Sequence, residues 1–202
     1  MSAEQRHAGG RPRAFDENQA LDAAIDVFWR LGYEGASLAE LTQAMGINKP
    51  SLYAVYGSKE DLFVRALERY RQCYHGHLSQ LLAQPTAYGV LEAYLRDTAK
   101  AVRAGSAPGC LSIHGGISCG PNNAHIPQML AEYRHGIEEA IAKALAATDD
   151  AADIDADSLA GYAVTIGQGL AVDAAAGVPQ GRLNAAVDVA LAGLAATLKS
   201  GQ

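Results

Sequence analysis

Cysteine, proline and aromatic residues are scarce in this sequence of 202 residues, which holds 3 cysteines, 7 prolines and 6% aromatic residues. An odd number of cysteines, with no apolar secretion signal ahead of them, argues against a disulfide framework and predicts a cytoplasmic protein with reduced thiols. The longest apolar stretch, residues 185–198, is short and contains Asp188, so no membrane span is expected. Few aromatic residues and few Val/Ile/Tyr runs also argue against an all-β fold.

The sequence also lacks an overall positive charge, since 16 Lys and Arg residues face 22 Asp and Glu residues for a net charge of −6. Residues 1–103 are balanced, with 12 basic and 12 acidic residues, whereas residues 104–202 hold 4 and 10. A non-specific binder of nucleic acids would be basic throughout. Any contact with DNA is therefore expected from a local patch in the first half of the chain.

Alanine, the best helix former, accounts for 40 of the 202 residues. Apolar residues recur at spacings of three and four after Asp16, a plausible N-cap, and Gly32 follows them. Ser37 and Glu40 have the spacing of a capping box, Asn48 and Ser58 precede further helical segments, and Pro50 suits a first turn. We expect an all-α fold, with helices over residues 16–31, 38–45, 49–56, 59–84, 87–104, 111–118, 124–147, 157–176 and 182–199.

Two of these expected helices, 38–45 and 49–56, are short, are joined at Gly46 and carry apolar stripes that can pack on Phe28 and Trp29. The outward face of the second helix is left with Lys49, Ser51, Tyr53 and Ala54. No carboxylate occurs between Glu40 and Glu60. A helix that enters the major groove needs such a face, with hydrogen-bond donors, small side chains and no repulsion from phosphate. A helical hairpin that only packs is the alternative interpretation.

The order of residues in this region resembles the N-terminal domain of the TetR/AcrR family of bacterial repressors. The similarity covers about residues 12–65 and rests on the runs GYEGAS at 32–37 and LTQAMGINKPSLYAVYGSKEDLF at 41–63. The segment RPRAFD at 11–16 resembles the N-terminal arm of one subgroup. The resemblance implies a homodimer that binds double-stranded operator DNA, with a three-helix helix-turn-helix domain followed by a helical ligand-binding and dimerisation domain.

The resemblance further implies that the helix starting at Lys49 is the recognition helix. Ser37, Tyr53 and Lys59 would contact phosphate, and Lys49, Ser51 and Ala54 would face bases. Val55 departs from family members that have a polar residue at this position, and a contact with a thymine methyl group is expected instead. Tyr56 would belong to the core. The implied DNA-binding residues are Arg11, Arg13, Ser37, Lys49, Pro50, Ser51, Tyr53, Ala54, Val55 and Lys59. We accordingly expect a disordered segment at 1–10, the DNA-binding domain at 11–60, and the effector-binding and dimerisation domain at 61–202.

Tyrosine combines apolar area with a polar tip, as small-molecule pockets require, and six of the nine tyrosines follow residue 65. The candidates for an effector pocket are Tyr70, Tyr74, Tyr94, His114, Tyr133 and Tyr162, although each tyrosine alone is compatible with ordinary core packing. The expected helix over 59–84 would connect this pocket to the DNA-binding domain. Small residues at helical spacing form the candidate dimer interface, which consists of Ala160, Ala163, Gly167, Ala171 and Ala174. Ordinary packing within one chain is the alternative interpretation.

Two alternatives to an organic effector remain open from the sequence. Cys110 and His114 share a helical face with Cys119 downstream, which is compatible with a metal site or a redox-sensitive thiol, although the spacing is loose. The second alternative is an enzyme or small-molecule carrier built on a helical bundle. The sequence contains neither a phosphate-binding loop nor a His-Glu-x-x-His motif that would support catalysis. We therefore predict a regulator without enzymatic activity and without a cofactor other than its unidentified effector.

Overall fold

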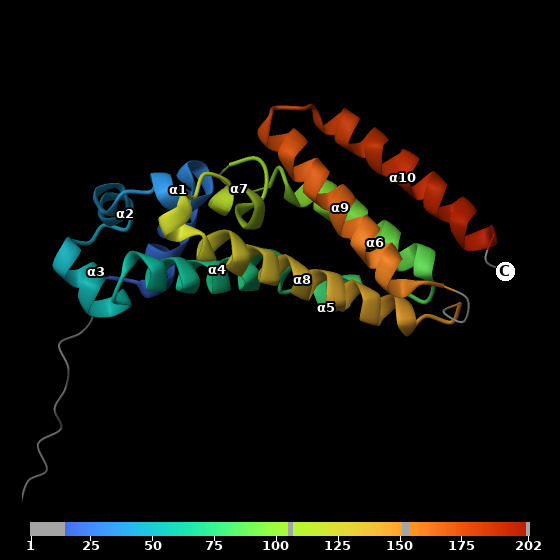
Figure 1. Cartoon of the computed structure of the whole chain (residues 1–202), viewed down its shortest axis with the longest axis horizontal. Coiled ribbons are helices and arrows are strands. Elements are labelled where there is room, and N and C mark those ends of the chain that lie inside the picture. Colours follow the sequence, from blue (N-terminus) through green and yellow to red (C-terminus); the bar gives the residue numbers. More distant parts are fainter. Residues whose placement is uncertain (1–14, 105–106, 151–153, 201–202) are drawn as a thin grey trace, which may run out of the picture.

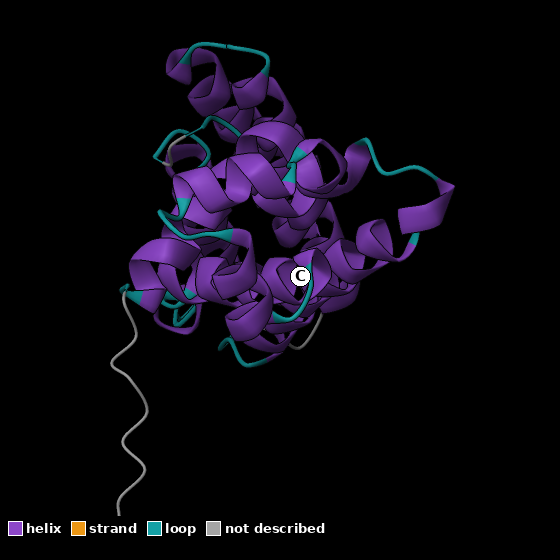
Figure 2. Ribbon diagram, turned by 90° about the vertical axis from the view of Figure 1, so that its left-hand side faces the viewer, coloured by secondary structure: helices purple, strands orange, loops and turns teal. Residues whose placement is uncertain are grey.

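The computed structural model of the chain describes residues 15–104, 107–150 and 154–200, and every regular element among them is a helix (Figures 1 and 2). This confirms the all-α prediction. The elements are α1 (Glu17–Gly35), α2 (Leu38–Ala44), α3 (Lys49–Tyr56), α4 (Lys59–His75), α5 (Leu78–Leu81), α6 (Ala87–Ala101), α7 (Leu111–Ile117), the 3-10 helix η1 (Pro121–Asn123), α8 (His125–Ala146), α9 (Ala156–Ala175) and α10 (Gln180–Ser200). The expected segment 1–10 and the basic arm with Arg11 and Arg13 lie outside the described residues.

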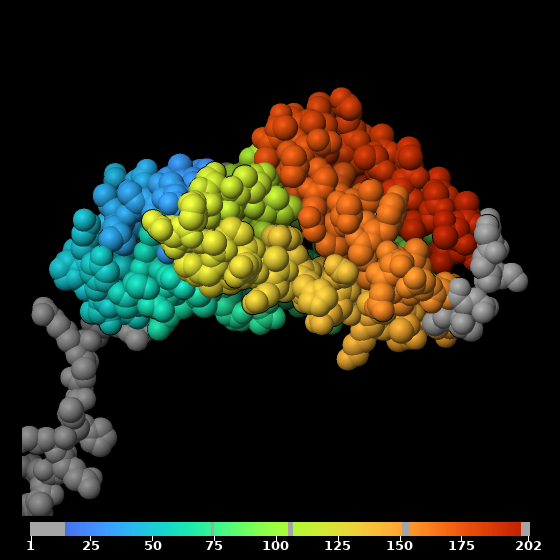
Figure 3. All heavy atoms as spheres, viewed as in Figure 1, coloured from blue at the N-terminus to red at the C-terminus, as the bar shows by residue number. Residues whose placement is uncertain are grey.

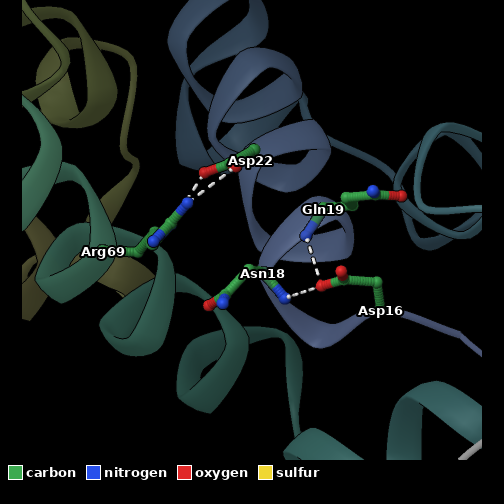
Figure 4. A network of polar contacts seen from close by, with 5 residues as sticks. All are labelled: Asp16, Asn18, Gln19, Asp22 and Arg69. Atoms are coloured by element: carbon green, nitrogen blue, oxygen red, sulfur yellow. Dashed lines mark hydrogen bonds and ion pairs between the residues drawn. The ribbon is translucent and has the colours of Figure 1, made fainter.

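The first four helices begin at residues whose side chains cap them, as the sequence predicts. The carboxylate of Asp16 accepts hydrogen bonds from the backbone N–H groups of Asn18 and Gln19 at the start of α1 (Figure 4). Ser37 and Glu40 form a reciprocal capping box at the start of α2. The side chains of Asn48 and Ser58 each accept one backbone N–H, from Ser51 at the start of α3 and from Asp61 at the start of α4. Each cap satisfies N–H groups that the first turn of a helix leaves without partners.

Gly32, where the sequence predicts the end of the first helix, breaks the helical geometry inside α1. Its φ of 69° and ψ of 171° redirect the chain before α1 ends at Gly35. A side chain is strained at this φ, and a Cβ atom there would lie 3.4 Å from the carbonyl oxygen of His114. Glycine is therefore favoured by the backbone turn, while the approach of α7 leaves little more than van der Waals room for a side chain.

The helix expected over residues 59–84 is two helices, because α4 ends at His75 and α5 begins at Leu78. Gly76 follows α4, and glycine costs about 1 kcal/mol relative to alanine inside a helix. The turn allows α5 to pack on α6 instead of continuing along the axis of α4. A single straight helix therefore does not connect the two ends of this segment.

The molecule is elongated, with α2 and α3 near one end and α10 toward the other (Figures 1 and 3). Its buried apolar residues form two hydrophobic cores. The first core contains the aromatic residues of α1 and α4, but it also takes Leu111, Ile126 and Leu130 from α7 and α8. Arg69 of α4 pairs with Asp22 of α1 over its surface, with N–O distances of 2.8 and 2.9 Å (Figure 4). The second core is formed largely by α6, α8, α9 and α10. Packing thus continues across residue 60, where the sequence suggests a domain boundary.

None of the helices in the described ranges is long and apolar enough to cross a membrane.

Candidate DNA-binding surface and internal cavity

Helix α3 presents one buried face and one exposed face. Leu52 and Tyr56 are buried in the first core, with 0% and 2% of their surface exposed. The core position expected for Tyr56 is therefore confirmed. Lys49, Pro50, Tyr53 and Ala54 are exposed on the other face, and Tyr53 keeps 49% of its surface accessible. The exposed face has the composition that the sequence predicts for a recognition helix.

Three other predicted DNA contacts are partly engaged by the protein itself. The hydroxyl of Ser37 accepts the N–H of Glu40 at 3.2 Å, although the residue is exposed. Ser51 is half-buried, and its backbone N–H donates to Asn48 at 2.9 Å. Val55 is also half-buried and packs against the first core. Val55 therefore contributes to folding, whatever it contributes to base contacts.

Lys59 lies between α3 and the junction of α1 with α7. Its Nζ atom is 4.6 Å from the centre of the Tyr33 ring and 3.5 Å from the carbonyl oxygen of Glu34. Burial lowers the pKa of Lys59, against the opposing effect of the Glu34 carboxylate. A phosphate contact by Lys59 would have to form from this half-buried position or displace the ammonium group from Tyr33.

A cavity lies between α4–α5, α6, α7, α8 and α9, well separated in sequence from α3. Its volume is about 70 Å³. Among the predicted pocket residues, Tyr70 and Tyr94 line this cavity. Its wall also contains side chains that the sequence analysis did not select: His75, His77, Asp97, Thr98, Ser112, Ile113, Arg134 and Gln168.

The remaining predicted pocket residues lie elsewhere. Tyr133 lines a more open groove between the C-terminal half of α4, α5 and α8, and Tyr162 is 43% exposed. His114 is outside the cavity wall, and its Nδ1 atom lies 3.1 Å from the carbonyl oxygen of Cys110. The side chain of Tyr74 is not among those described. The spacing of residues in the sequence could not separate these residues from the two that line the cavity. Which face of a helix lines a cavity depends on how the neighbouring helices pack, and the sequence does not show that packing.

Cys110 forms a polar chain along the cavity wall. Its Sγ atom is 3.3 Å from the hydroxyl of Tyr70 and 3.1 Å from the hydroxyl of Ser112. The suggested metal set does not assemble, since the described residues contain no group of three His, Cys, Asp or Glu side chains that could hold a metal ion. Cys119 lies instead near Glu34 and Lys59, and burial raises the pKa of its thiol. Cys110 and Cys119 therefore belong to different surroundings.

His75 occupies the wall shared by the cavity and the open groove. Its ring packs between Tyr70 and Tyr133, with ring-centre distances of 5.7 and 5.9 Å. Burial, assisted by nearby His77, lowers the pKa of His75 to about 4. This histidine is not among the predicted pocket residues, and its only sequence signal is its position next to Gly76 at the end of a helix.

The small-residue face of α9 is covered within one chain, which corrects its expected role as the dimer interface. The exposed surface of Ala160, Ala163 and Ala174 is 0%, and that of Ala171 is 1%. A Cβ atom at Gly167 would lie 3.0 Å from the hydroxyl of Tyr94 on α6. Small residues do permit close helix approach here, but the approaching helix belongs to the same chain. The exposed apolar residues of this region are Tyr162, Val172 and Val189.

Two hydrogen bonds link the end of α1 to the segment that follows α7. The carboxylate of Glu34, near the end of α1, accepts hydrogen bonds from the backbone N–H of Gly120 at 3.2 Å and the side-chain amide of Asn123 at 3.0 Å. These bonds, with Asn123 contributing most, lower the pKa of Glu34. Because α7 carries Ser112 in the cavity wall and leads directly to Gly120, this contact joins the cavity wall to the helix-turn-helix.

A helix-turn-helix whose second helix is exposed and free of acidic residues, packed on a larger helical unit, is an architecture of DNA-binding proteins. A family model described as "Bacterial regulatory proteins, tetR family" matches residues 20–66. The HTH-type transcriptional repressor BdcR of Escherichia coli strain K12 is 34% identical over 146 residues, 70% of this chain and 71% of BdcR. The chain belongs to the TetR family of bacterial regulatory proteins, as its sequence resemblance predicts.

Two further relatives support this assignment. The HTH-type transcriptional repressor ComR of Escherichia coli strain K12 is 35% identical over 133 residues, which is 64% of this chain and 63% of ComR, less than two thirds of that protein. A solved structure of the TetR family transcriptional regulator CifR, a cysteine mutant in complex with 26-bp double-strand operator DNA, superposes with a TM-score of 0.85. That structure is 39% identical in sequence and covers 90% of this chain and 98% of the CifR chain.

Proposed function

We propose that the protein is a transcriptional repressor that binds operator DNA through α3 and is released by a small molecule in the cavity. The observation that carries this proposal is the exposed face of α3, which presents Lys49, Tyr53 and Ala54 without an intervening carboxylate. Such a face can approach phosphates and base edges without charge repulsion. The names of BdcR and ComR as repressors support the same direction of regulation.

The repressor acts as a homodimer whose two copies of α3 read a near-palindromic site. A two-fold dimer places equivalent helices in successive major grooves, so the half-sites are about 34–36 Å apart. The exposed apolar residues Tyr162 and Val172 on α9 and Val189 on α10 supply the contact surface between copies. Their exposure of 43%, 48% and 74% in a single chain leaves apolar area for a partner to cover.

Effector binding weakens operator binding by moving α7 and α4 relative to α1. Both helices carry residues of the cavity wall, and both pack on α1. A shift of α7 is transmitted through Gly120 and Asn123 to Glu34, which lies one short connection before α2. By linkage, effector and operator reduce each other's affinity by the same factor.

The first experiment is a gel-shift titration with DNA flanking the protein's own coding region. Tyr53→Ala should weaken binding to every sequence, because the hydroxyl is predicted to contact phosphate. Lys49→Ala should lose about 10-fold or more for the preferred operator and change which base is preferred, since a good base contact is worth about 1–3 kcal/mol. Arg182→Ala, an exposed basic residue on α10, is the charge-matched control and should bind normally.

Two results would contradict this proposal. One is a Lys49→Ala variant that keeps both operator preference and affinity, and the other is a wild-type chain that remains monomeric at micromolar concentration in the ultracentrifuge. The titration should be repeated at several salt concentrations. Binding that does not weaken with salt would exclude a contact to the phosphate backbone.

Redox control is a second candidate because the Cys110 thiol lines the cavity and contacts the hydroxyl groups of Tyr70 and Ser112. Oxidation of Cys110 would change the same wall that an effector contacts. Release of DNA by peroxide, reversed by a thiol reductant and without any organic ligand, distinguishes this candidate from effector control.

A further inference from the structure

Arg134 of α8 is a cation in the wall of the cavity. Its guanidinium group donates a hydrogen bond to the backbone carbonyl of Ser112. Burial lowers the pKa of this side chain, so the charged form is partly deprived of water. Among the ion pairs found in the described residues, none involves Arg134. The cavity therefore contains a partly desolvated positive charge without a carboxylate partner.

The other ionisable groups of the wall do not neutralise this charge. Asp97 is the acidic residue among the wall residues, and its carboxylate lies 3.1 Å from Nε2 of His77. His75 is neutral at physiological pH because of its burial. The Cys110 thiol is also in the wall and interacts electrostatically with Arg134, but no carboxylate of the described wall pairs with this guanidinium group. A carboxylate that complements Arg134 would therefore come from outside the protein, and pairing would offset part of the cost of a partly buried charge.

The hydrogen-bonding capacity near Arg134 suits a carboxylate. Arginine carries five N–H donors in a planar fork, and the carbonyl of Ser112 accounts for one of them. Two parallel N–H groups bind a carboxylate in bidentate geometry. The hydroxyl groups of Ser112, only 2% exposed, and Tyr94 line the same cavity and add donors.

The remaining wall and the size of the cavity restrict the rest of the ligand. Most other lining side chains are apolar, among them Leu78, Ile113, Ile137 and Val164. One water molecule needs about 10–15 Å³ of this kind of volume, so a cavity of about 70 Å³ holds roughly five to seven heavy atoms. An aliphatic chain of about three or four carbons ending in one charged group fills that space.

We propose that the effector is a short-chain aliphatic carboxylate held by Arg134, with its carbon chain against Ile113 and Ile137. The role of this ligand as an effector rests on the proposed function, whereas its binding site depends only on the cavity. A ligand of so few atoms cannot bind much more tightly than micromolar, because small ligands are limited in affinity per atom. Dissociation constants between micromolar and millimolar are expected.

The test is isothermal calorimetry on the full chain with butanoate, the neutral isostere butanamide and inorganic phosphate, each at matched ionic strength. Butanoate should bind at least 10-fold more tightly than butanamide or phosphate. Arg134→Gln should lose about 10- to 100-fold for butanoate, the range of a charge-assisted hydrogen bond, and leave butanamide unchanged. Arg96→Gln is the matched control, because Arg96 pairs with Glu92 and Asp188 on the surface away from the cavity.

Equal affinity for butanoate and butanamide would overturn the proposal, as would full butanoate binding by Arg134→Gln. Tighter binding of phosphate than of butanoate would overturn the aliphatic part. If Arg134→Gln loses its helical circular dichroism, Arg134→Lys replaces it as a variant that keeps the charge. The comparison of butanoate with butanamide on the wild-type chain tests the proposal in either case. Butanoate binding without release of DNA in the gel shift would overturn its role as effector. Absence of any DNA binding would instead refute the proposed function and leave the calorimetric result standing.

Discussion

The first four helices and the later helices of the described chain begin in different ways. In α1, α2, α3 and α4, a side chain at the N-cap accepts a backbone N–H of the first turn. At α5, α7 and α8 the residue preceding the helix makes no such bond. Only α6, capped by Thr86, and α9, capped by Asp155, repeat the pattern in the later part of the described chain.

This difference shows where the chain encodes its structure locally. A side-chain cap fixes the starting residue of a helix and contributes about 1 kcal/mol. The starts of α7 and α8 depend instead on tertiary packing, so we expect their stability to depend more on the neighbouring helices than that of α1 to α4 does. Under the proposed function, this dependence would let α7 and α8 respond to the contents of the cavity.

The largest effect that separates the two regions is expected from their core residues. Phe28 is fully buried, and its ring lies 4.9 Å from that of Phe63 and 6.2 Å from that of Tyr33. Phe28→Ala should reduce the free energy of unfolding by about 3–5 kcal/mol, because it leaves a cavity among aromatic rings. Urea denaturation followed by circular dichroism measures the change.

The matched change in the second core is Ala163→Gly, at a residue that is also fully buried. It removes one methyl group and helix propensity, so a loss of about 1–2 kcal/mol is expected. Because Ala163→Gly removes one carbon and Phe28→Ala removes a whole ring, equal losses in the two variants would show that the alanine-rich core is the more sensitive one per atom removed.

A second, intermediate effect concerns the boundary between the regions, where His75 ends α4. Its pKa is lowered to about 4, compared with about 6.5 in an unfolded chain. The unfolded state therefore binds more protons below pH 6.5, and the free energy of unfolding should fall as the pH decreases. The expected loss between pH 6.5 and pH 5 is roughly 1.5 kcal/mol.

His75→Phe should flatten this part of the pH profile, because phenylalanine retains the ring between Tyr70 and Tyr133 without titrating. Carboxylates with lowered pKa values, such as Glu34 and Glu68, affect stability only at more acidic pH. An unchanged slope between pH 6.5 and 5 in the variant would assign the acid sensitivity to another group.

The smallest effect tests the caps directly. Ser37→Ala removes the acceptor for the N–H of Glu40 and opens the capping box, so a loss of about 1 kcal/mol in unfolding free energy is expected. Ser79→Ala, within α5, serves as the control because serine has no capping role there. A Ser37→Ala variant as stable as Ser79→Ala would mean that packing, rather than the cap, fixes the start of α2.

The starts of the first four helices were predictable from the sequence because their signals are local. Asp16, Ser37, Asn48 and Ser58 act on N–H groups two or three residues away, and Gly32 breaks the helix through its own φ. The exposed face of α3 was predictable for the same reason, since its period of 3.6 residues is visible in eight residues.

The cavity was only partly predictable because it is assembled from five separated segments. Tyr70 and Tyr94 were chosen for their chemistry, but the same chemistry also selected Tyr162, which lies on the surface. Arg134 had a usable signal, as one of 4 basic residues after residue 103. The five small residues of α9 are covered within the chain. A small-residue face shows that some helix approaches closely, and the sequence does not say whether α6 or a second chain provides that helix.

The sharing of Leu111, Ile126 and Leu130 between the first core and the cavity helices limits how this regulator can be recombined with its relatives. A chimera joined at residue 60 would pair half of one interior with half of another. By contrast, the segment from Ser37 to Gly57 contributes only a few inward side chains, such as Leu41 and Leu52. We expect that transplanting that segment alone, with those inward positions retained, would exchange operator specificity while leaving the cavity helices unchanged.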